Sequence, residues 1–248
     1  METECPCNGA VKLAGGLARE ATARHINLGD DMIKRMTLLA KKEGSSISDF
    51  RAYWAGCHAE LALCMDGITS YTQNRVEKRL WQCSNGSGQF TVDGVVELCF
   101  ESDEAMSRAQ HSRVGSEYIP QDEPNFLYGW TLCVVTPEDE PRERLGVKVL
   151  VLATTKDECS RVDFKEAVVK ANALSATHAE VTFNWTERSA KRDRLWAEPV
   201  APNVLLAMWF GNTAQAHDAF RADGELASQI SRLSTQASAY LINALIKR

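Results

Sequence analysis

The chain has 248 residues, of which 44% are hydrophobic and 25% are charged, and its formal net charge is −5. This composition is typical of a globular protein, and no window approaches the roughly 18 consecutive apolar residues of a membrane span. Lysine and arginine are scattered along the chain, which leaves no positive stripe for a phosphate backbone. We therefore expect neither nucleic acid nor a membrane as a partner.

Eight cysteines are present, but a chain of this length can build its own hydrophobic core without disulfides. Residues 1–31 carry charges where the apolar centre of a secretory signal would lie. We therefore expect free thiols and a cytoplasmic location. Cys5 and Cys7 have no further ligands nearby, and the CxxC, HExxH, GxGxxG and P-loop spacings are absent from the sequence. No metal and no cofactor is expected.

Residues 48–75 combine a readable helix with chemically capable side chains. We expect Ser48 or Asp49 to cap this helix and Asp66-Gly67 to end it. The three-to-four spacing of one buried stripe is followed by Phe50, Tyr53, Trp54, Cys57, Leu61, Cys64 and Met65. His58 then lies at or beside the buried face. It is either a core histidine bonded to a backbone carbonyl or an acid/base residue.

The predicted elements follow one order twice. Residues 1–31 are expected to form an N-terminal arm and residues 136–146 a linker that is rich in charge and proline. The first half is predicted as strand 32–41, the helix around His58, strand 68–79, loop 81–91, strand 94–100, helix 102–112, loop 115–125 and strand 126–135. The second half is predicted as strand 147–153, helix 163–176, strand 178–188, strand 203–210, helix 213–222 and strand 237–246. Each half therefore reads βαββαβ, a ferredoxin-like unit.

Residue matches also indicate an internal repeat. Asp49-Phe50 corresponds to Asp163-Phe164, and Asn74 corresponds to Asn184. A unit that leaves one sheet face uncovered implies that the two sheets pack together. The predicted fold is α+β: two ferredoxin-like repeats, 32–135 and 147–248, packed sheet to sheet as an intrachain α+β barrel. Such a pseudo-dimer would be a monomer or would form a homodimer.

The two repeats differ in their polar residues. In this alignment Asn172 takes the place of His58, and Ala207 takes the place of Glu97. Only the first repeat keeps the polar pair, which favours a single site in residues 32–135. The second repeat is then a degenerate copy.

The first half resembles a known family. MIKRMTLLAKKEGSSISDFRAYWAGCHAELALCMDGITSYTQNRV, then FTVDGVVELCFES-DEAM and DEPNFL, resemble the EthD family of dimeric α+β barrel proteins over about residues 32–135. The resemblance implies a hydrophobic cavity between sheet and helices that holds a few acid/base groups. EthD-like proteins include decarboxylases or dehydratases of polyketide-like aromatics, and related barrels include lactone isomerases, cofactor-free monooxygenases and haem enzymes. One departure is Cys57, where many relatives have proline before the histidine.

We predict His58 and Glu97 as the catalytic pair, because an imidazole at an apolar pocket transfers protons near neutral pH and Glu97 could orient it or act as a second acid/base group. The alternative for Glu97 is the solvent face of its strand. Residues expected to bind substrate are Tyr53, Trp54, Tyr71, Asn74, Tyr128 and Trp130. The predicted function is a cofactor-independent lyase or isomerase acting on an apolar, aromatic or polycyclic small molecule. Two alternatives stay open: a cofactor-free or haem-dependent monooxygenase, and a non-catalytic carrier of hydrophobic small molecules.

Overall fold

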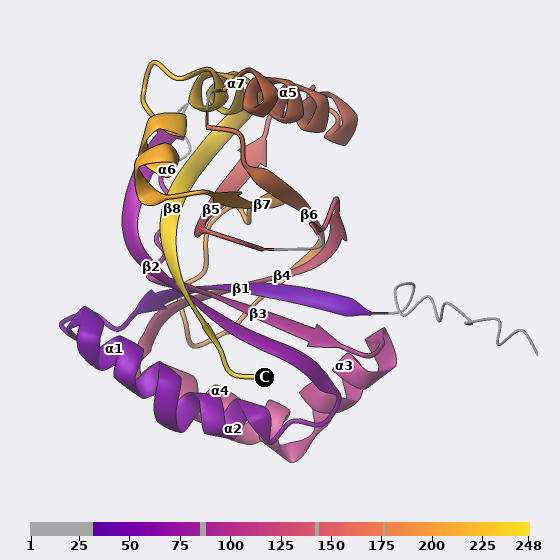
Figure 1. Cartoon of the computed structure of the whole chain (residues 1–248). Coiled ribbons are helices and arrows are strands. Elements are labelled where there is room, and N and C mark those ends of the chain that lie inside the picture. Colours follow the sequence, from indigo (N-terminus) through magenta and orange to yellow (C-terminus); the bar gives the residue numbers. More distant parts are fainter. Residues whose placement is uncertain (1–31, 85–87, 142–143, 176) are drawn as a thin grey trace, which may run out of the picture. The chain divides into compact units, whose positions relative to one another are not determined.

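The computed structural model describes residues 32–84, 88–141, 144–175 and 177–248, so the predicted N-terminal arm lies outside the described residues. Eight antiparallel strands close into one barrel in the order β1-β3-β2-β8-β5-β7-β6-β4 (Figure 1). The predicted α+β barrel is therefore confirmed. The strands are β1 (Ile33–Lys41), β2 (Ile68–Ser84), β3 (Gly94–Phe100), β4 (Leu127–Glu138), β5 (Val147–Thr155), β6 (Glu180–Lys191), β7 (Val204–Phe210) and β8 (Ser234–Ile246).

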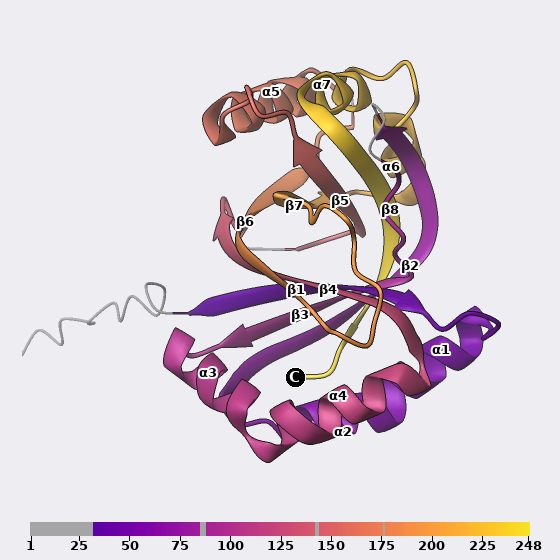
Figure 2. The ribbon, with the colours of Figure 1, turned by 180° about the vertical axis from the view of Figure 1, so that it is seen from behind.

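Helices cover the outside of the barrel in two groups, one formed by α1–α4 and the other by α5–α7 (Figures 1 and 2). The α-helices are α1 (Ile47–Tyr53), α2 (Ala59–Leu63), α3 (Asp103–His111), α4 (Ile119–Asp122), α5 (Arg161–Leu174), α6 (Thr213–Ala219) and α7 (Glu225–Leu233). Three short turns complete the set: η1 (Trp54–His58) and η2 (Val114–Tyr118) are π-helical, and η3 (Glu123–Asn125) is a 3-10 turn.

Alternation along the strands divides the apolar residues into an interior core and two outer cores. In β1, Met36 and Leu38 belong to the barrel interior, together with Leu150 and Leu205 from the second half. Leu39 belongs instead to the core beneath the α1–α4 group. Successive side chains of a strand point to opposite faces, so each strand of the first half contributes to both cores.

Two seams join the halves: β2 pairs with β8, and β4 pairs with β6. The loop predicted to begin at Trp81 is wrong in its first residues, because β2 continues to Ser84 by pairing with Gln236 of β8. In the same way β4 runs to Glu138, inside the predicted linker, by pairing with Phe183 of β6. Pairing with strands of the other half therefore lengthens both β2 and β4. The local sequence of these two strands carries no information about such distant partners.

Several local predictions were also wrong. The loop predicted over residues 115–125 is largely helical, since Pro120 and Pro124 lie in the first turns of α4 and η3, where a missing N–H costs little. Ser46, not Ser48 or Asp49, caps α1, and its Oγ accepts from the backbone N–H of Asp49 at 3.0 Å. Helix α7 was not predicted.

Corresponding positions in the two halves have matching geometry. Asn74 pairs with Val95 and Asn184 pairs with Leu205. Each asparagine Nδ2 donates to the carbonyl of its paired residue, at 3.1 Å and 2.9 Å. The strand order β4-β1-β3-β2 of the first half likewise has its counterpart in β8-β5-β7-β6.

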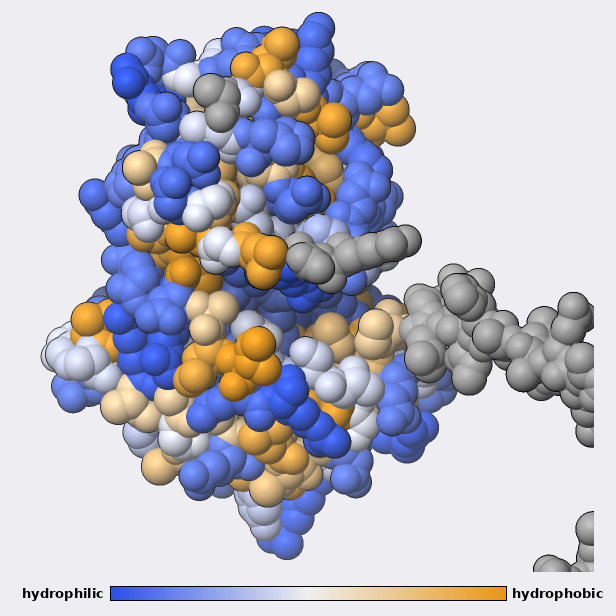
Figure 3. Space-filling view, viewed as in Figure 1, coloured by the Kyte–Doolittle hydropathy of each residue, from blue (hydrophilic) through white to orange (hydrophobic). Residues whose placement is uncertain are grey.

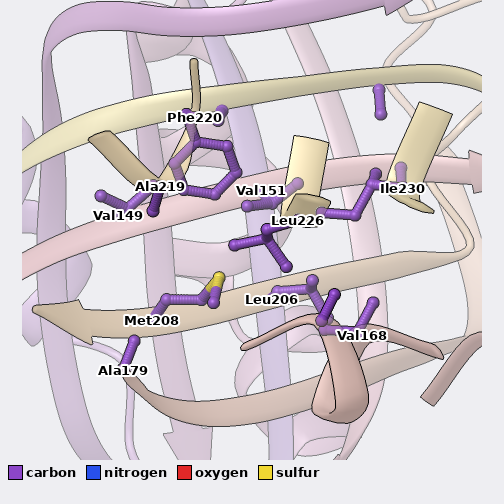
Figure 4. Close-up of a cluster of buried hydrophobic side chains, with 14 of the residues drawn as sticks. Val149, Val151, Val168, Ala179, Leu206, Met208, Ala219, Phe220, Leu226 and Ile230 are labelled. Atoms are coloured by element: carbon purple, nitrogen blue, oxygen red, sulfur yellow. The ribbon is translucent and has the colours of Figure 1, made fainter. Parts of the chain in front are cut away.

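The core beneath α5–α7 is filled by apolar side chains. Figure 4 shows Val168, Leu206, Met208 and Phe220 gathered with aliphatic neighbours between the helices and the strands. At its edge Asn172 donates to the carbonyl of Ala179 at 2.7 Å and accepts from the N–H of the same residue at 3.0 Å. Asn172 thus has a structural role in holding the chain after α5.

On the surface seen in Figure 3, hydrophobic residues form small groups among hydrophilic ones. Within the described ranges, no helix has the length and apolar character needed to cross a membrane. The six cysteines in these ranges, Cys57, Cys64, Cys83, Cys99, Cys133 and Cys159, are free thiols.

Glu198, between β6 and β7, makes stability depend on pH. Its buried carboxylate accepts from the N–H of Thr91 at 2.7 Å, and burial raises the pKa of Glu198 to about 7. An unfolded glutamate has a pKa of about 4.3, so between these values only the folded protein keeps the proton and stability falls as pH rises. In urea unfolding, Glu198→Gln should be more stable than the parent by roughly 1–3 kcal/mol at about pH 8 and equal to it near pH 4. The same difference at both pH values would contradict this.

Candidate functional site

A π-helical turn sets the position of His58. In η1, Gly56 has φ −97° and ψ −106°, which departs from helical geometry. The wider turn leaves Trp54 and His58 buried and turns Cys57 toward solvent. The predicted stripe is therefore wrong at Cys57 and Cys64, both of which are exposed. A π turn adds one residue to a helical turn, so the buried face shifts relative to a regular helix.

His58 is held by a carboxylate that was not predicted. Its Nδ1 lies 2.8 Å from Oδ2 of Asp122, at the end of α4. The hydroxyl of Tyr53 donates to Oδ1 of Asp122 at 2.6 Å. The hydrogen bond from His58, followed by the opposing effect of burial and the bond from Tyr53, keeps the pKa of Asp122 below its usual value. Because an ionised carboxylate only accepts, Nδ1 carries the proton and Nε2 of the neutral ring keeps its lone pair.

His58 lines a small cavity between the α1–α4 group and the outer face of the sheet. The cavity volume is about 40 Å³. Most of its wall is apolar, and the polar members are few. The lining residues are Arg35, Thr37, Leu39, His58, Ala62, Met65, Tyr71, Val96, Leu98, Ile119, Glu123, Leu127 and Trp130. A cavity of roughly 150 Å³ is needed to hold benzene, so an aromatic substrate requires this cavity to open.

Two of the predicted substrate-binding residues lie in the cavity wall. Tyr71 is buried there, and burial raises its pKa to about 12, so its hydroxyl stays protonated at neutral pH. The hydroxyl of Tyr71 accepts from Nε2 of Gln73 at 2.9 Å. Trp130 is also buried in the wall. A neutral phenol and an indole next to a histidine can donate hydrogen bonds to an oxygen atom of a ligand.

The structure places the other predicted residues elsewhere. Trp54 is fully buried in the helix–sheet core against Phe50, with ring centroids 5.4 Å apart. Tyr53 reaches the site only through Asp122. Tyr128 is 40% exposed and stacks on Trp196. The prediction that these aromatic residues share one cavity is therefore wrong for Trp54 and Tyr128.

Glu97 and Asn74 lie on the opposite face of the sheet from His58. Val96 and Leu98 line the cavity, so Glu97 between them points into the barrel. There it meets Nζ of Lys34 at 3.2 Å and accepts hydrogen bonds from Lys148 and Asn74.

Although burial acts to raise the pKa of Glu97, the ammonium groups of Lys148 and Lys34 outweigh it and hold the pKa well below its usual range. The predicted pairing of Glu97 with His58 is wrong, and so is its alternative on the solvent face. The register of β3 decides this, because it places the Glu97 side chain on the face of the sheet opposite His58, and the backbone of the sheet separates the two side chains.

Three charged residues of the site were not predicted as functional: Arg35, Asp122 and Glu123. Arg35 and Glu123 are buried, with exposures of 8% and 3%. Burial, followed by repulsion from Arg192, lowers the pKa of Arg35 to about 10. The sequence held one signal, two adjacent acidic residues before a proline and an apolar strand. This signal is weak, because the sequence predicts a loop for the segment and a loop does not fix where its side chains point.

A metal or haem does not fit this site. No group of three or more potential metal ligands occurs within the described residues. A porphyrin is far larger than the cavity beside His58, and Nδ1 of that ring is already engaged by Asp122. His178 is exposed in the turn before β6. No chemical step is therefore assigned to a haem.

The fold and the cavity define an α+β barrel protein with a hydrogen-bonded His58–Asp122 pair under its first helical group. Residues 42–128 match the EthD domain model, in agreement with the sequence resemblance. No curated protein matches the sequence.

Solved structures resemble this chain at low sequence identity. An anthrone oxidase-like protein is 7% identical, with a TM-score of 0.57, over 88% of this chain and 94% of that chain. A putative monooxygenase from Fusobacterium nucleatum is 10% identical, with a TM-score of 0.51, over 87% and 94%. An EthD family protein from Bacillus halodurans is 18% identical over 39% and 87%, with a TM-score of 0.31, which is too low to bear on the fold. At these identities the likeness concerns the fold alone.

Asp122 is expected to act as a positioning residue. In Asp122→Asn the side-chain amide can donate to Nδ1 and favour the wrong tautomer of His58, so kcat should fall by roughly 100-fold with KM little changed. Nitrogen-15 NMR should show the ring proton moving from Nδ1 to Nε2. Glu117→Gln, an exposed acid in η2, is the matched control and should change neither. An unchanged tautomer in the folded Asp122→Asn protein would contradict the assignment.

Proposed function

We propose that this chain is a cofactor-independent monooxygenase that acts on a largely apolar aromatic substrate whose acidic C–H group is conjugated with a carbonyl, and that His58 is its general base. The observation that carries the proposal is the His58–Asp122 hydrogen bond at the wall of an apolar cavity. A carboxylate at Nδ1 orients the ring and stabilises the imidazolium that forms when Nε2 takes a proton.

The other polar residues of the cavity support the same step. The buried guanidinium of Arg35 and the neutral hydroxyl of Tyr71 are in the wall with His58. Both can stabilise the negative charge that develops on a carbonyl oxygen as the proton leaves. The low-dielectric surroundings strengthen these interactions relative to water.

The proposed reaction balances without a reductant. His58 accepts one proton of a methylene group, and the resulting carbanion reacts with O₂. One oxygen atom becomes the new ketone on that carbon, and the other leaves as water with the two methylene hydrogens. Carbon loses four electrons and O₂ gains four. A cavity of about 40 Å³ has room for a molecule as small as O₂, while the aromatic ring requires opening.

The names of two structural relatives support this choice. One is an anthrone oxidase-like protein and another a putative monooxygenase. They favour the oxygenase over the lyase or isomerase that the residues alone first suggested. The proposed aromatic character of the substrate is supported by the name of the anthrone oxidase-like relative.

Anthrone, a methylene ketone, is a suitable probe. With the purified chain we expect O₂ consumption above the uncatalysed rate and one labelled oxygen atom per ketone formed under ¹⁸O₂. Catalysed oxidation that needs an added reductant or metal would contradict the proposal. So would the absence of any acceleration.

A lyase or isomerase is the second candidate, because the same base would start either reaction. Without O₂, the chain should catalyse exchange of the methylene protons with deuterated water. Exchange without any oxidation in air would favour the lyase or isomerase. Binding without exchange or oxidation would favour a carrier of hydrophobic molecules.

We also infer that the barrel consists of two ferredoxin-like repeats and is a pseudo-dimer within one chain. The equal register at Asn74 and Asn184 and the equivalent strand orders support this inference. The second repeat has a filled core at the place where the first has its cavity, which agrees with a single site per chain.

A further inference from the structure

Glu123 separates two spaces. It lines the small cavity of His58, and it also lines a surface groove of about 240 Å³ beside Pro120 and the segment Arg192–Leu195. Small-molecule sites usually have volumes of roughly 300 Å³ or more. Neither space reaches that size alone, whereas the two joined together come close to it.

Arg192, from the second half of the chain, holds Glu123 in place. Its Nε lies 3.0 Å from Oε2 of Glu123. Its guanidinium also stacks over the ring of Trp130, 4.8 Å from the centroid, and Trp130 is in the cavity wall. The ion pair therefore lies where the cavity and the groove adjoin.

Arg35 lies on the inner side of the same wall. It is buried, and within the described residues its Nε has no hydrogen-bond partner. Its guanidinium carbon lies 5.9 Å from the centroid of the Phe100 ring. Buried polar groups are normally hydrogen-bonded, and an unpaired buried donor is destabilising. Such a donor in a cavity wall is suited to binding an acceptor from a ligand.

We propose that the Arg192–Glu123 ion pair is the gate of the cavity, and that an anionic group of the substrate, a carboxylate or a phenolate, enters through the groove and takes the place of Glu123 between Arg192 and Arg35. This proposal rests on the proposed function, since it names the substrate class of the same site.

The charges around the gate agree with this exchange. Burial, opposed by the attraction of Arg192 and His58, raises the pKa of Glu123, so its carboxylate is easier to neutralise and release than an exposed one. The pKa of Arg35 is about 10, which leaves the guanidinium charged at neutral pH. An anion that arrives when Glu123 moves out would restore the charge balance between the two arginines.

A pair of probes that differ only in charge tests this proposal. Binding of 1-naphthoate and 1-naphthamide to the full chain is measured by tryptophan fluorescence or calorimetry. Naphthoate is expected to bind at least 10-fold more tightly than naphthamide. Arg35→Gln and Arg192→Gln should each reduce this preference to less than about 3-fold, while Arg35→Lys should keep part of it because the charge remains.

Arg194→Gln is the matched control, because Arg194 lines the groove but is exposed and does not line the cavity. It should leave the preference unchanged. Equal binding of the two probes, no binding of naphthoate, or an unchanged preference in folded Arg35→Gln would overturn the proposal.

A failure of the proposed function can be distinguished from a failure of the proposed anion site. His58→Asn should keep the preference for naphthoate, since that measurement needs no turnover. If the preference is present but anthrone is neither oxidised nor exchanged, the anion site stands and the assigned reaction is wrong. If anthrone is oxidised and the preference is absent, the reaction stands and the anion site is wrong.

Discussion

Replacing His58 with asparagine is expected to lower the turnover of a methylene ketone by roughly two to four orders of magnitude, the usual contribution of a positioned proton-transfer group. The imidazole is the one ring in the cavity wall that is held by a carboxylate, so no neighbour can take over its proton transfer with the same geometry. The pH–rate profile should lose the limb that belongs to the imidazole. Stability should change little if the proposed repeat holds, because Asn172 would then be the equivalent residue of the second half, where it is buried in α5.

His111→Asn is the matched control for this experiment. His111 is an exposed histidine in the last turn of α3, outside the cavity. Its replacement should leave kcat/KM and the thermal unfolding midpoint unchanged. A folded His58→Asn protein that turns over at near the parent rate would show that His58 is a core histidine. The chemistry would then have to be sought at Tyr71 and Arg35.

The second large effect concerns stability. Glu97→Gln is expected to lower the free energy of unfolding by about 3 kcal/mol, because the ammonium groups of Lys34 and Lys148 would lose their buried counter-charge. For a chain of this length the unfolding midpoint should fall by roughly 10 °C. The kcat and its pH profile should stay near those of the parent, since Glu97 and His58 lie on opposite faces of the sheet.

Glu187→Gln provides the comparison. Glu187 pairs with Arg161 at 2.8 Å, but both side chains are about half exposed, so the loss should be less than about 1 kcal/mol. The lowered pKa of Glu97 means that its stabilisation is present above the unfolded value of about 4.3 and is lost as the pH falls below it. The difference between parent and Glu97→Gln should therefore shrink in acid. Equal losses of unfolding free energy in Glu97→Gln and Glu187→Gln at neutral pH would contradict the expectation that the buried ion pairs of Glu97 contribute more than an exposed one.

The position of Asp122 illustrates why the site was only partly predictable. Asp122 is 64 residues from His58 in the sequence, and helix α4, where the sequence predicts a loop, brings it to Nδ1. Local spacing can place His58 on a buried face, but it carries no information about a partner that arrives from another element. Arg192 is more distant still, since it belongs to the second half.

The sequence by itself determined the strands and helices whose hydrophobic periodicity is local, the α+β barrel, the EthD segment and the candidate His58. Only the tertiary structure decided which side chains of distant elements come into contact. The π turn rotated Cys57 out of the core, and the register of β3 sent Glu97 into the barrel and away from His58. The physical reason is the period of two along a strand: one position separates a residue of the cavity from a residue of the interior, and the pairing with distant strands sets that position.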